Sequence, residues 1–477
     1  MVFASFPFLF LFLPLFLACY FATPAGRRNW TILIFSWAFY AWWRVDFLGL
    51  LVGVTGFTYA IGRLMGAAGP RTPRARRLMA LGIVGDLGVL AWFKYANFGV
   101  TTFNEVLGAL GRPPAGWTEV VLPIGLSFYV LQSISYLVDV GRGDVPVCRS
   151  FLDYAAYKAI FSQLIAGPIV RYAEIKGDLH RRQHSLRAFG IGSRTFMVGF
   201  AMKVAVADTL SPLADAAFAL PRPTVADAWL GAAGYTLQLY FDFAGYSLMA
   251  IGLSRMIGFH FPRNFDHPYL AASIQDFWQR WHITLSRFLR DYLYIPLGGN
   301  RRGSLRTYVN LMEVMAIGGL WHGASWTFVV WGLWHGALLG AHRWWAGARG
   351  RIAVPYPLAN ALTLLAVVLG WVIFRAPDVG GALAMYRGMA GLNGLSLSDA
   401  LAWQATPDRL LFVPIAAALV YAPLLRDRLR RPAPAVAAGD RGPAGLALWT
   451  AAPPAGFALA VVLLYSRDAV PFLYFQF

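Results

Sequence analysis

Residues 309–341 read VNLMEVMAIGGLWHGASWTFVVWGLWHGALLGA, an apolar run that contains His322 and has basic stretches on both sides. Its length of about 33 residues is short for two full membrane crossings of ~20 residues each. Basic segments next to membrane helices stay in the cytoplasm. We therefore predict a hairpin that enters and leaves the membrane from the cytoplasmic side, with His322 near its apex, deep in the membrane and beside a cavity.

A second histidine lies upstream, in the segment Asp276-Phe-Trp-Gln-Arg-Trp-His282. Imidazoles in or beside hydrocarbon cost free energy, so they mark candidate sites of chemistry. Projected as one helix over 276–292, the segment gathers His282 with its apolar residues, and we expect the helix to lie along the cytoplasmic interface. The opposite, polar side carries Asp276, Arg280, Arg287, Arg290 and Asp291.

Composition sets the class of protein. Hydrophobic residues make up 58% of the 477 residues and charged residues 13%, which is more apolar than a soluble globular protein. The formal charge of +18 comes from basic clusters between apolar stretches, a pattern typical of membrane topology rather than of nucleic-acid binding. Cys19 and Cys148 are too few and too far apart to predict a disulfide framework or a thiolate metal site.

The charge pattern also predicts the topology of a single membrane domain over 1–477. The first apolar stretch, Val2 to Phe21, reads as a retained anchor, and Arg27 and Arg28 after it predict an outside N-terminus. The segment 151–170 has basic loops at both ends, so we expect it to dip into the membrane and return, with a helix break at Ala166-Gly167-Pro168.

Several candidate residues leave two interpretations open. A neutral imidazole at position 322 can accept a proton from a hydroxyl or thiol, whereas Gly318 and Gly319 beside it also fit ordinary helix packing. Asp242 could orient a histidine or serve as a structural hydrogen-bond partner. His335 and His342 are expected at the interface. The remaining histidines, in basic loops, are expected to be solvated: His180, His184, His260 and His267.

Some catalytic motifs are missing from the sequence. It contains no Gly-x-Ser-x-Gly nucleophile elbow, no phosphate-binding Walker loop and no His-Glu-x-x-His zinc helix. Hydrolysis by those routes and ATP-driven pumping therefore lose support, and no metal site is predicted.

The region from about 120 to 345 resembles the membrane-bound O-acyltransferase (MBOAT) superfamily. The resemblance rests on the following motifs: Pro123-Ile-Gly-Leu-Ser-Phe-Tyr, Ala166-Gly-Pro-Ile-Val-Arg-Tyr, Leu239-Tyr-Phe-Asp-Phe-Ala-Gly-Tyr, Asn264-Phe-Asp-His-Pro-Tyr, Asp276-Phe-Trp-Gln-Arg-Trp-His, Arg290-Asp-Tyr-Leu-Tyr-Ile-Pro-Leu-Gly-Gly-Asn-Arg and Gly319-Leu-Trp-His-Gly-Ala. It is most similar to the bacterial branch that acetylates polysaccharides such as alginate. Leu248 and Gln279 depart from the usual pattern, which bears on the acceptor and on partner contacts.

The resemblance implies an all-α polytopic integral membrane protein of about 10 to 12 membrane helices, including re-entrant and interfacial helices, around a central funnel or tunnel. It implies that His322 is the active-site histidine and His282 the second motif histidine. The residues expected to bind substrate or support the site are Asp242, Asp276, Trp278, Arg280, Trp281, Arg287, Arg290 and Trp321.

The expected reaction is O-acetyl transfer in the bacterial inner membrane. Acetyl-CoA, a donor substrate rather than a bound cofactor, would dock from the cytoplasm with its phosphates near Arg280, Arg287 and Arg290, because guanidinium groups match phosphate oxygens. The acceptor is an extracytoplasmic polysaccharide, reached directly or through an extracytoplasmic acetyltransferase partner. Two alternatives remain: a proton-coupled carrier or flippase for an anionic lipid or polymer, and an acyltransferase that acts on a lipid or protein.

Overall fold

The computed structural model describes residues 1–348, 354–429, 443–467 and 472–473, and every regular element in these ranges is helical. Five of the described helices are long and apolar enough to cross a membrane, with bounds at 45–68, 73–109, 186–218, 356–375 and 407–424. The prediction of an all-α polytopic membrane protein is therefore confirmed. Two of these helices contain π-helical turns, which is why each is divided below.

The chain forms two compact units. Among the described residues, unit 1 comprises 1–193 and 250–262, and unit 2 comprises 194–249 and the described residues from 263 to 473. The elements within unit 1 are η1 (Pro7–Phe12), α1 (Leu13–Ala22), η2 (Ala25–Arg27), α2 (Arg28–Ala41), α3 (Val45–Ala68), α4 (Pro73–Leu90), η3 (Ala91–Tyr95), α5 (Ala96–Ala109), α6 (Leu126–Arg142), α7 (Phe151–Ala159), α8 (Phe161–Leu164) and α9 (Tyr172–His180). The chain passes between the units within α10 (Leu186–Ala201) and α12 (Val225–Met256).

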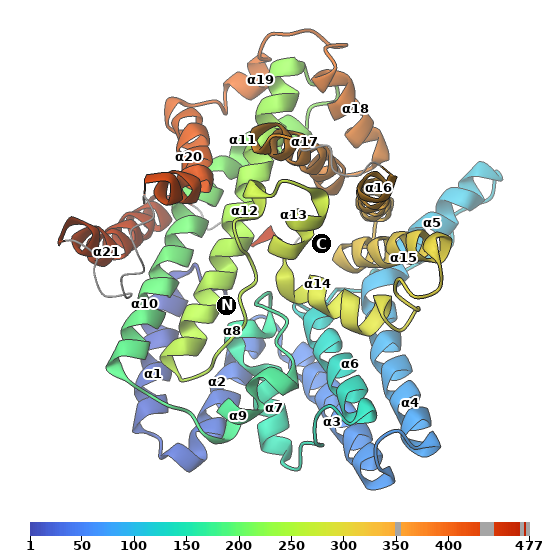
Figure 1. The fold of residues 1–477 in the computed structure, drawn as a ribbon, viewed down its shortest axis with the longest axis vertical. Coiled ribbons are helices and arrows are strands. Elements are labelled where there is room, and N and C mark those ends of the chain that lie inside the picture. Colours follow the sequence, from blue (N-terminus) through green and yellow to red (C-terminus); the bar gives the residue numbers. More distant parts are fainter. Residues whose placement is uncertain (349–353, 430–442, 468–471, 474–477) are drawn as a thin grey trace. The chain divides into compact units, whose positions relative to one another are not determined.

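Unit 2 holds the remaining elements, which Figure 1 shows in green to red. They are η4 (Met202–Ala207), α11 (Asp208–Phe218), η5 (Pro268–Leu270), α13 (Ile274–Arg280), α14 (Ile283–Leu289), η6 (Arg290–Tyr294), α15 (Ser304–His322), α16 (Trp326–Ala348), α17 (Tyr356–Arg375), α18 (Val379–Met389), α19 (Asp399–Ala402), α20 (Pro407–Leu429) and α21 (Pro443–Ser466).

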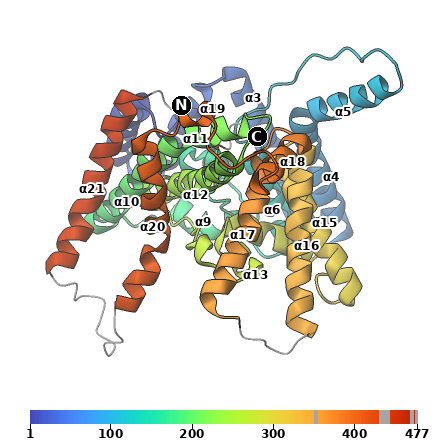
Figure 2. The ribbon, with the colours of Figure 1, turned by 90° about the horizontal axis from the view of Figure 1, so that it is seen from above.

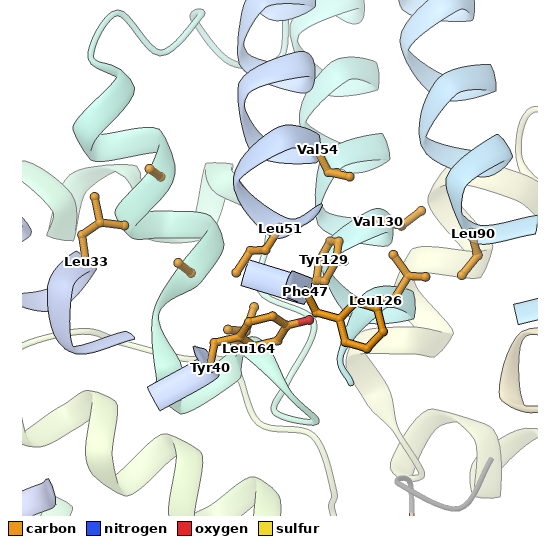
Figure 3. Packing of buried hydrophobic residues seen from close by; sticks show 12 residues of the cluster. Leu33, Tyr40, Phe47, Leu51, Val54, Leu90, Leu126, Tyr129, Val130 and Leu164 are labelled. Carbon is orange, nitrogen blue, oxygen red and sulfur yellow. The ribbon is translucent and has the colours of Figure 1, made fainter. Parts of the chain in front are cut away.

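The core of unit 1 packs α6 against the helices before and after it. Figure 3 shows Tyr129 and Val130 of α6 beside Leu51 and Val54 of α3, all four of them buried. Gly125, in the first family-like motif, begins α6 with φ of +77°, and a Cβ there would overlap the carbonyl oxygen of Leu164. The motif therefore contains glycine at this position because the turn needs a left-handed backbone conformation and leaves no room for a Cβ beside the main chain of Leu164.

The predicted break in the segment 151–170 is present, although it begins earlier than expected. The helix is interrupted at Ile160, and regular structure ends at Leu164, before Ala166-Gly167-Pro168. The fully buried Ser36 Oγ accepts a hydrogen bond of 3.0 Å from the N–H of Phe161, which satisfies one of the backbone groups that the interruption leaves.

In unit 2, α15 and α16 form a helical hairpin over the predicted residues, and Figure 2 shows α17 running alongside α16. The hairpin's entry into the membrane from the cytoplasmic side stays a prediction. Its arms of 19 and 23 residues are longer than expected, because they extend beyond the apolar run into polar residues at both ends. Glycines let the arms approach closely. A Cβ at Gly319 would overlap the carbonyl oxygen of Phe328, and one at Gly332 would overlap that of Met315. The sequence left open whether Gly319 serves helix packing, and the structure shows that it does.

The predicted single helix over 276–292 is wrong. The structure divides it into α13, α14 and η6, with Trp281 and His282 between the first two. Ser273 caps α13 by accepting a hydrogen bond from the N–H of Asp276, and His282 adopts a left-handed conformation with φ of +42°. Helical periodicity cannot reveal such a kink, because the helices on either side keep their apolar faces inward.

Candidate active site

His322 is the last residue of α15, at the closed end of the hairpin. Its side chain is buried, with 5% of the residue exposed. Aromatic rings surround it, with centroids 5.0 Å away for Trp321, 5.2 Å for Trp331 and 5.4 Å for Phe374. The imidazole of His322 therefore packs against three flat, polarisable rings.

His282 lies 6.4 Å from His322, measured between ring centroids. The residue is fully buried, and the ring of Phe243 packs on it at 4.7 Å. A left-handed backbone at a residue other than glycine costs about 1–3 kcal/mol and persists only where the surroundings fix it. The fold therefore holds this imidazole in place at an energetic cost, as functional sites often do.

Asn264 determines which nitrogen of His282 carries the proton. Its Oδ1 accepts hydrogen bonds from the N–H of Thr284 at 3.3 Å and the hydroxyl of Thr284 at 2.9 Å, and its Nδ2 donates to Ser247 Oγ at 3.1 Å. Since Oδ1 is an acceptor, His282 Nδ1, 3.1 Å away, must be the donor. The neutral imidazole then has its lone pair on Nε2, the nitrogen able to accept a proton.

The surroundings of His282 also keep it neutral. It lies between two seven-residue helices, outside the helices that are long enough to cross a membrane. Burial lowers the pKa of His282 to about 3, because desolvation disfavours the imidazolium form. An uncharged ring with a fixed tautomer can accept a hydrogen bond from a hydroxyl at any physiological pH.

The three predicted tryptophans belong to the aromatic cluster that contains the buried histidines, but only Trp321 contacts His282 and His322 directly. Trp321 lies beside both His322 and His282, with its ring 6.3 Å from the ring of His282. Trp281 is buried and packs at 4.9 Å on Trp371 of α17. Trp278 donates a hydrogen bond of 3.3 Å from Nε1 to Nδ1 of His335.

The interfacial position predicted for His335 is wrong, because this residue is fully buried. Its ring lies 5.0 Å from Trp331 and 5.2 Å from Trp278. The prediction failed because α16 continues to Ala348, about 20 Å of helix beyond His335, so that only His342 approaches the end. The helical spacing of Trp331, His335, Leu339 and His342 is the signal that would have placed His335 on one face with Trp331.

The charged residues of the segment 276–292 are distributed over α13, α14 and η6, where Arg287 and Arg290 are exposed and the other three are half-buried. Arg280 pairs with Asp276 at 2.6 Å, and Arg290 pairs with Asp291 at 2.7 Å. Arg287 is exposed and forms no ion pair within the described ranges. The carboxylate of Asp276 also accepts from the N–H of Ala272 at 3.2 Å, which makes it a helix cap as well as an ion-pair partner.

Asp242 has a structural partner rather than a histidine. Its carboxylate lies 2.8 Å from Nζ of the buried Lys203, which also pairs with Asp208 at 2.5 Å. The N–H of Leu473 donates a hydrogen bond of 3.0 Å to the same carboxylate. Where the structure describes the chain, no histidine contacts Asp242, so the structural interpretation is the one that agrees with the geometry.

The other histidines lie at or near the surface. His180, His184, His260 and His267 are exposed, as predicted. His342, half-buried, lines a cavity of about 830 Å³ at the open end of the hairpin. The cavity is enclosed by residues of α13, η6, α15 and α16: Gln275, Tyr294, Ser304, Tyr308, Leu311, Leu339, His342, Arg343, Trp344, Ala346 and Gly347.

Comparison with known proteins places the chain among membrane acyltransferases. The model of the membrane-bound O-acyltransferase family matches residues 147–373, which include both buried histidines. The chain is 47% identical to a protein named "Probable alginate O-acetylase AlgI" in Azotobacter vinelandii, and the similarity spans the full length of both chains.

The chain belongs to the membrane-bound O-acyltransferase family. A Pseudomonas putida protein with the same name is 48% identical, again over the full length of both chains. A "Peptidoglycan O-acetyltransferase" of Helicobacter pylori is 38% identical over 82% of this chain and 80% of its own. These relatives make the chain an O-acyltransferase of the alginate O-acetylation branch, embedded in a membrane by several helices.

Proposed function

We propose that this acyltransferase moves an acetyl group from cytoplasmic acetyl-CoA to an extracytoplasmic polysaccharide such as alginate, with a separate extracytoplasmic transferase completing the transfer. The observation that supports it best is the pair of buried imidazoles, 6.4 Å apart, one of which, His282, is held as a neutral hydrogen-bond acceptor. A hydroxyl between the two rings could contact both. The full-length relatives named as alginate O-acetylases favour this acceptor class over the carrier interpretation.

His322 is the proposed general base. It takes the proton of the acceptor hydroxyl while the oxygen attacks the thioester carbonyl, and the imidazolium then returns the proton to the departing thiolate of coenzyme A as the C–S bond breaks. His282 Nε2 accepts a hydrogen bond that orients the hydroxyl or a bound water. Positioned proton transfer of this kind accounts for about 10² to 10⁴ in rate.

The donor is proposed to bind in the cavity at the open end of the hairpin. Arg343 supplies charge for phosphate, while Tyr308 and Trp344 offer aromatic faces for a base. The innermost lining residue on α15, Leu311, is 11 residues before His322, or about 16 Å of helix. An extended pantetheine arm can span that distance.

A row of side chains on α16 supports this route. From the cavity inward, Leu339, His335 and Trp331 follow one another at intervals of four residues on one helix face. Trp331 ends the row against the ring of His322. The arginines expected to bind phosphate fit less well, because Arg280 and Arg290 already pair with carboxylates, which leaves Arg287 as the candidate among them.

The test is acetyl transfer by the purified protein in lipid nanodiscs, measured as thiol release from acetyl-CoA in the presence of alginate oligomers and a partner transferase. His322→Gln keeps the side-chain volume and should lose at least about 10²-fold in kcat, with an unchanged unfolding temperature. His260→Gln, at an exposed position, is the matched control. A His322→Gln enzyme that keeps its activity would refute the assignment.

A second measurement separates donor binding from chemistry. Arg343→Ala should raise the KM for acetyl-CoA with little change in kcat, because the guanidinium would contact the donor and not the reacting atoms. An unchanged KM would contradict the proposed position of the donor.

A further inference from the structure

Unit 1 contains a second cluster of basic residues that the acyl-transfer reaction does not use. It surrounds a cavity of about 430 Å³ lined by Phe21, His184, Ser185, Leu186, Ala188, Phe189, Arg255 and Met256. Arg28 and Arg182 lie beside it, through contacts with His184 and Tyr20. The cations come from three separate basic stretches, each of which the sequence assigns to the same side of the membrane.

Arg182, beside this cavity, has spare hydrogen-bonding capacity. Arg182 donates from Nη2 to Asn29 Oδ1 at 2.5 Å, and its guanidinium lies 5.0 Å from the ring of Phe259. Its Nη1 is buried, and in the described part of the chain it has no hydrogen-bond partner. Buried guanidinium nitrogens are normally paired, so this donor points to a ligand.

The hydrogen bonds of His184 are those of a neutral ring, so the positive charge of the cluster comes from its arginines. The hydroxyl of Tyr20 donates a hydrogen bond of 2.8 Å to the carbonyl of Ile257. It must therefore accept the hydrogen bond of 3.0 Å that joins it to Nε2 of His184. Nδ1 of His184 is then the acceptor for Arg28 Nη1 at 3.2 Å. Partial desolvation of the ring, together with the charges of Arg28 and Arg182, lowers the pKa of His184, which favours a neutral ring beside two guanidinium groups.

The cavity wall next to these cations is apolar and open. Phe21 is 42% exposed and Leu186 is 93% exposed, and Phe189 and Met256 line the same cavity. An exposed apolar surface directly beside a basic cluster matches the boundary between lipid headgroups and acyl chains. A soluble phosphate would have no use for the apolar wall.

We propose that this cavity binds an anionic phospholipid, with the phosphate on Arg28, Arg182 and Arg255 and one acyl chain along Phe21, Leu186 and Phe189. The site lies wholly within unit 1 and is separate from the histidines of unit 2. It gives the enzyme a specific lipid ligand that does not depend on the proposed acyl-transfer reaction.

The test is lipid binding by the purified full chain, measured by native mass spectrometry and by the shift of its unfolding temperature on adding phosphatidylglycerol or phosphatidylcholine. Arg28→Gln/Arg255→Gln removes two cations and leaves the half-buried Arg182 in place. A basic residue near an anionic surface contributes about 1 kcal/mol, a factor of about five, so the double variant should bind phosphatidylglycerol about 25-fold more weakly. Arg74→Gln/Arg76→Gln, at two exposed arginines of α4, is the control of equal charge.

The proposal is supported if phosphatidylglycerol stabilises the wild type and the control pair, phosphatidylcholine does not, and the Arg28/Arg255 pair loses the effect. Equal losses in the two double variants would indicate non-specific attraction and overturn it. Inorganic phosphate is added in a further arm, and stabilisation by phosphate at the same concentration would overturn the lipid assignment.

Discussion

Asn264 fixes the tautomer of His282, and replacing it tests whether that tautomer matters for catalysis. Asn264→Asp keeps an oxygen acceptor for all three donors but adds a negative charge 3.1 Å from His282 Nδ1. With the charge centres about 4 Å apart and an effective dielectric constant near 20, the attraction is about 4 kcal/mol. That energy corresponds to about three pH units, which would move the pKa of His282 from about 3 to near 6.

The raised pKa should make the activity of the variant depend on pH in one direction. Below it, His282 becomes an imidazolium and Nε2 loses its lone pair, so the ratio of variant to wild-type kcat should fall about tenfold for each pH unit below roughly 6. Above pH 7 the ratio should be constant. The assay is thiol release from saturating acetyl-CoA between pH 5 and pH 8.5.

Asn264→Ala is the companion variant for stability. It leaves the N–H and hydroxyl of Thr284 and the N–H of His282 without their buried acceptor, at about 1–3 kcal/mol each, so the unfolding temperature should fall. A constant Asn264→Asp to wild-type ratio over the whole pH range would show that the charge state of His282 has no part in turnover.

Two further predictions concern the packing of unit 2. Lys203→Met leaves the carboxylates of Asp208 and Asp242 buried without their cation, so it should lower the free energy of unfolding by about 3–5 kcal/mol, measured by thermal or denaturant unfolding. Adding Asp208→Asn and Asp242→Asn should recover much of this loss, and an unchanged unfolding curve for Lys203→Met would contradict the pairing. Gly319→Ala places a methyl group against the carbonyl of Phe328 and should destabilise the protein by about 1–3 kcal/mol or more. Gly347 has open space around it, so Gly347→Ala should leave the stability unchanged; equal effects of the two variants would argue against the close contact of the two arms.

The hairpin could be predicted because its signals are strong. Basic residues flank the apolar run on both sides, and the glycines on either side of His322 mark a close turn. The kink at His282 could not be predicted, since a left-handed conformation at histidine comes from the contacts of Asn264 and Thr284, which are distant in sequence or lie beyond the turn. Sequence patterns report which face is apolar and not where a backbone turns by one residue.

Pairing over long sequence distances explains why the role of Asp242 stayed open and why the position of His335 was wrong. The partner of Asp242 is Lys203, which belongs to another helix and has no pattern that links the two. His335 looked interfacial because Arg343 follows it, but the helix extends further than its apolar residues do. In both cases the local composition was interpreted correctly, and the tertiary neighbour decided the environment.

The contacts of Gly319 and Gly332 join the two arms of the hairpin through main-chain atoms. His322 therefore stands at the end of a closely packed helix pair, in which the positions of Gly319 and Gly332 have no room for larger side chains. Changes in the size of the acyl group that the enzyme accepts must then arise from the opposing wall, where Phe374 of α17 faces the same ring. Attempts to engineer a wider range of acyl donors should begin with α17 and leave Gly319 and Gly332 unchanged.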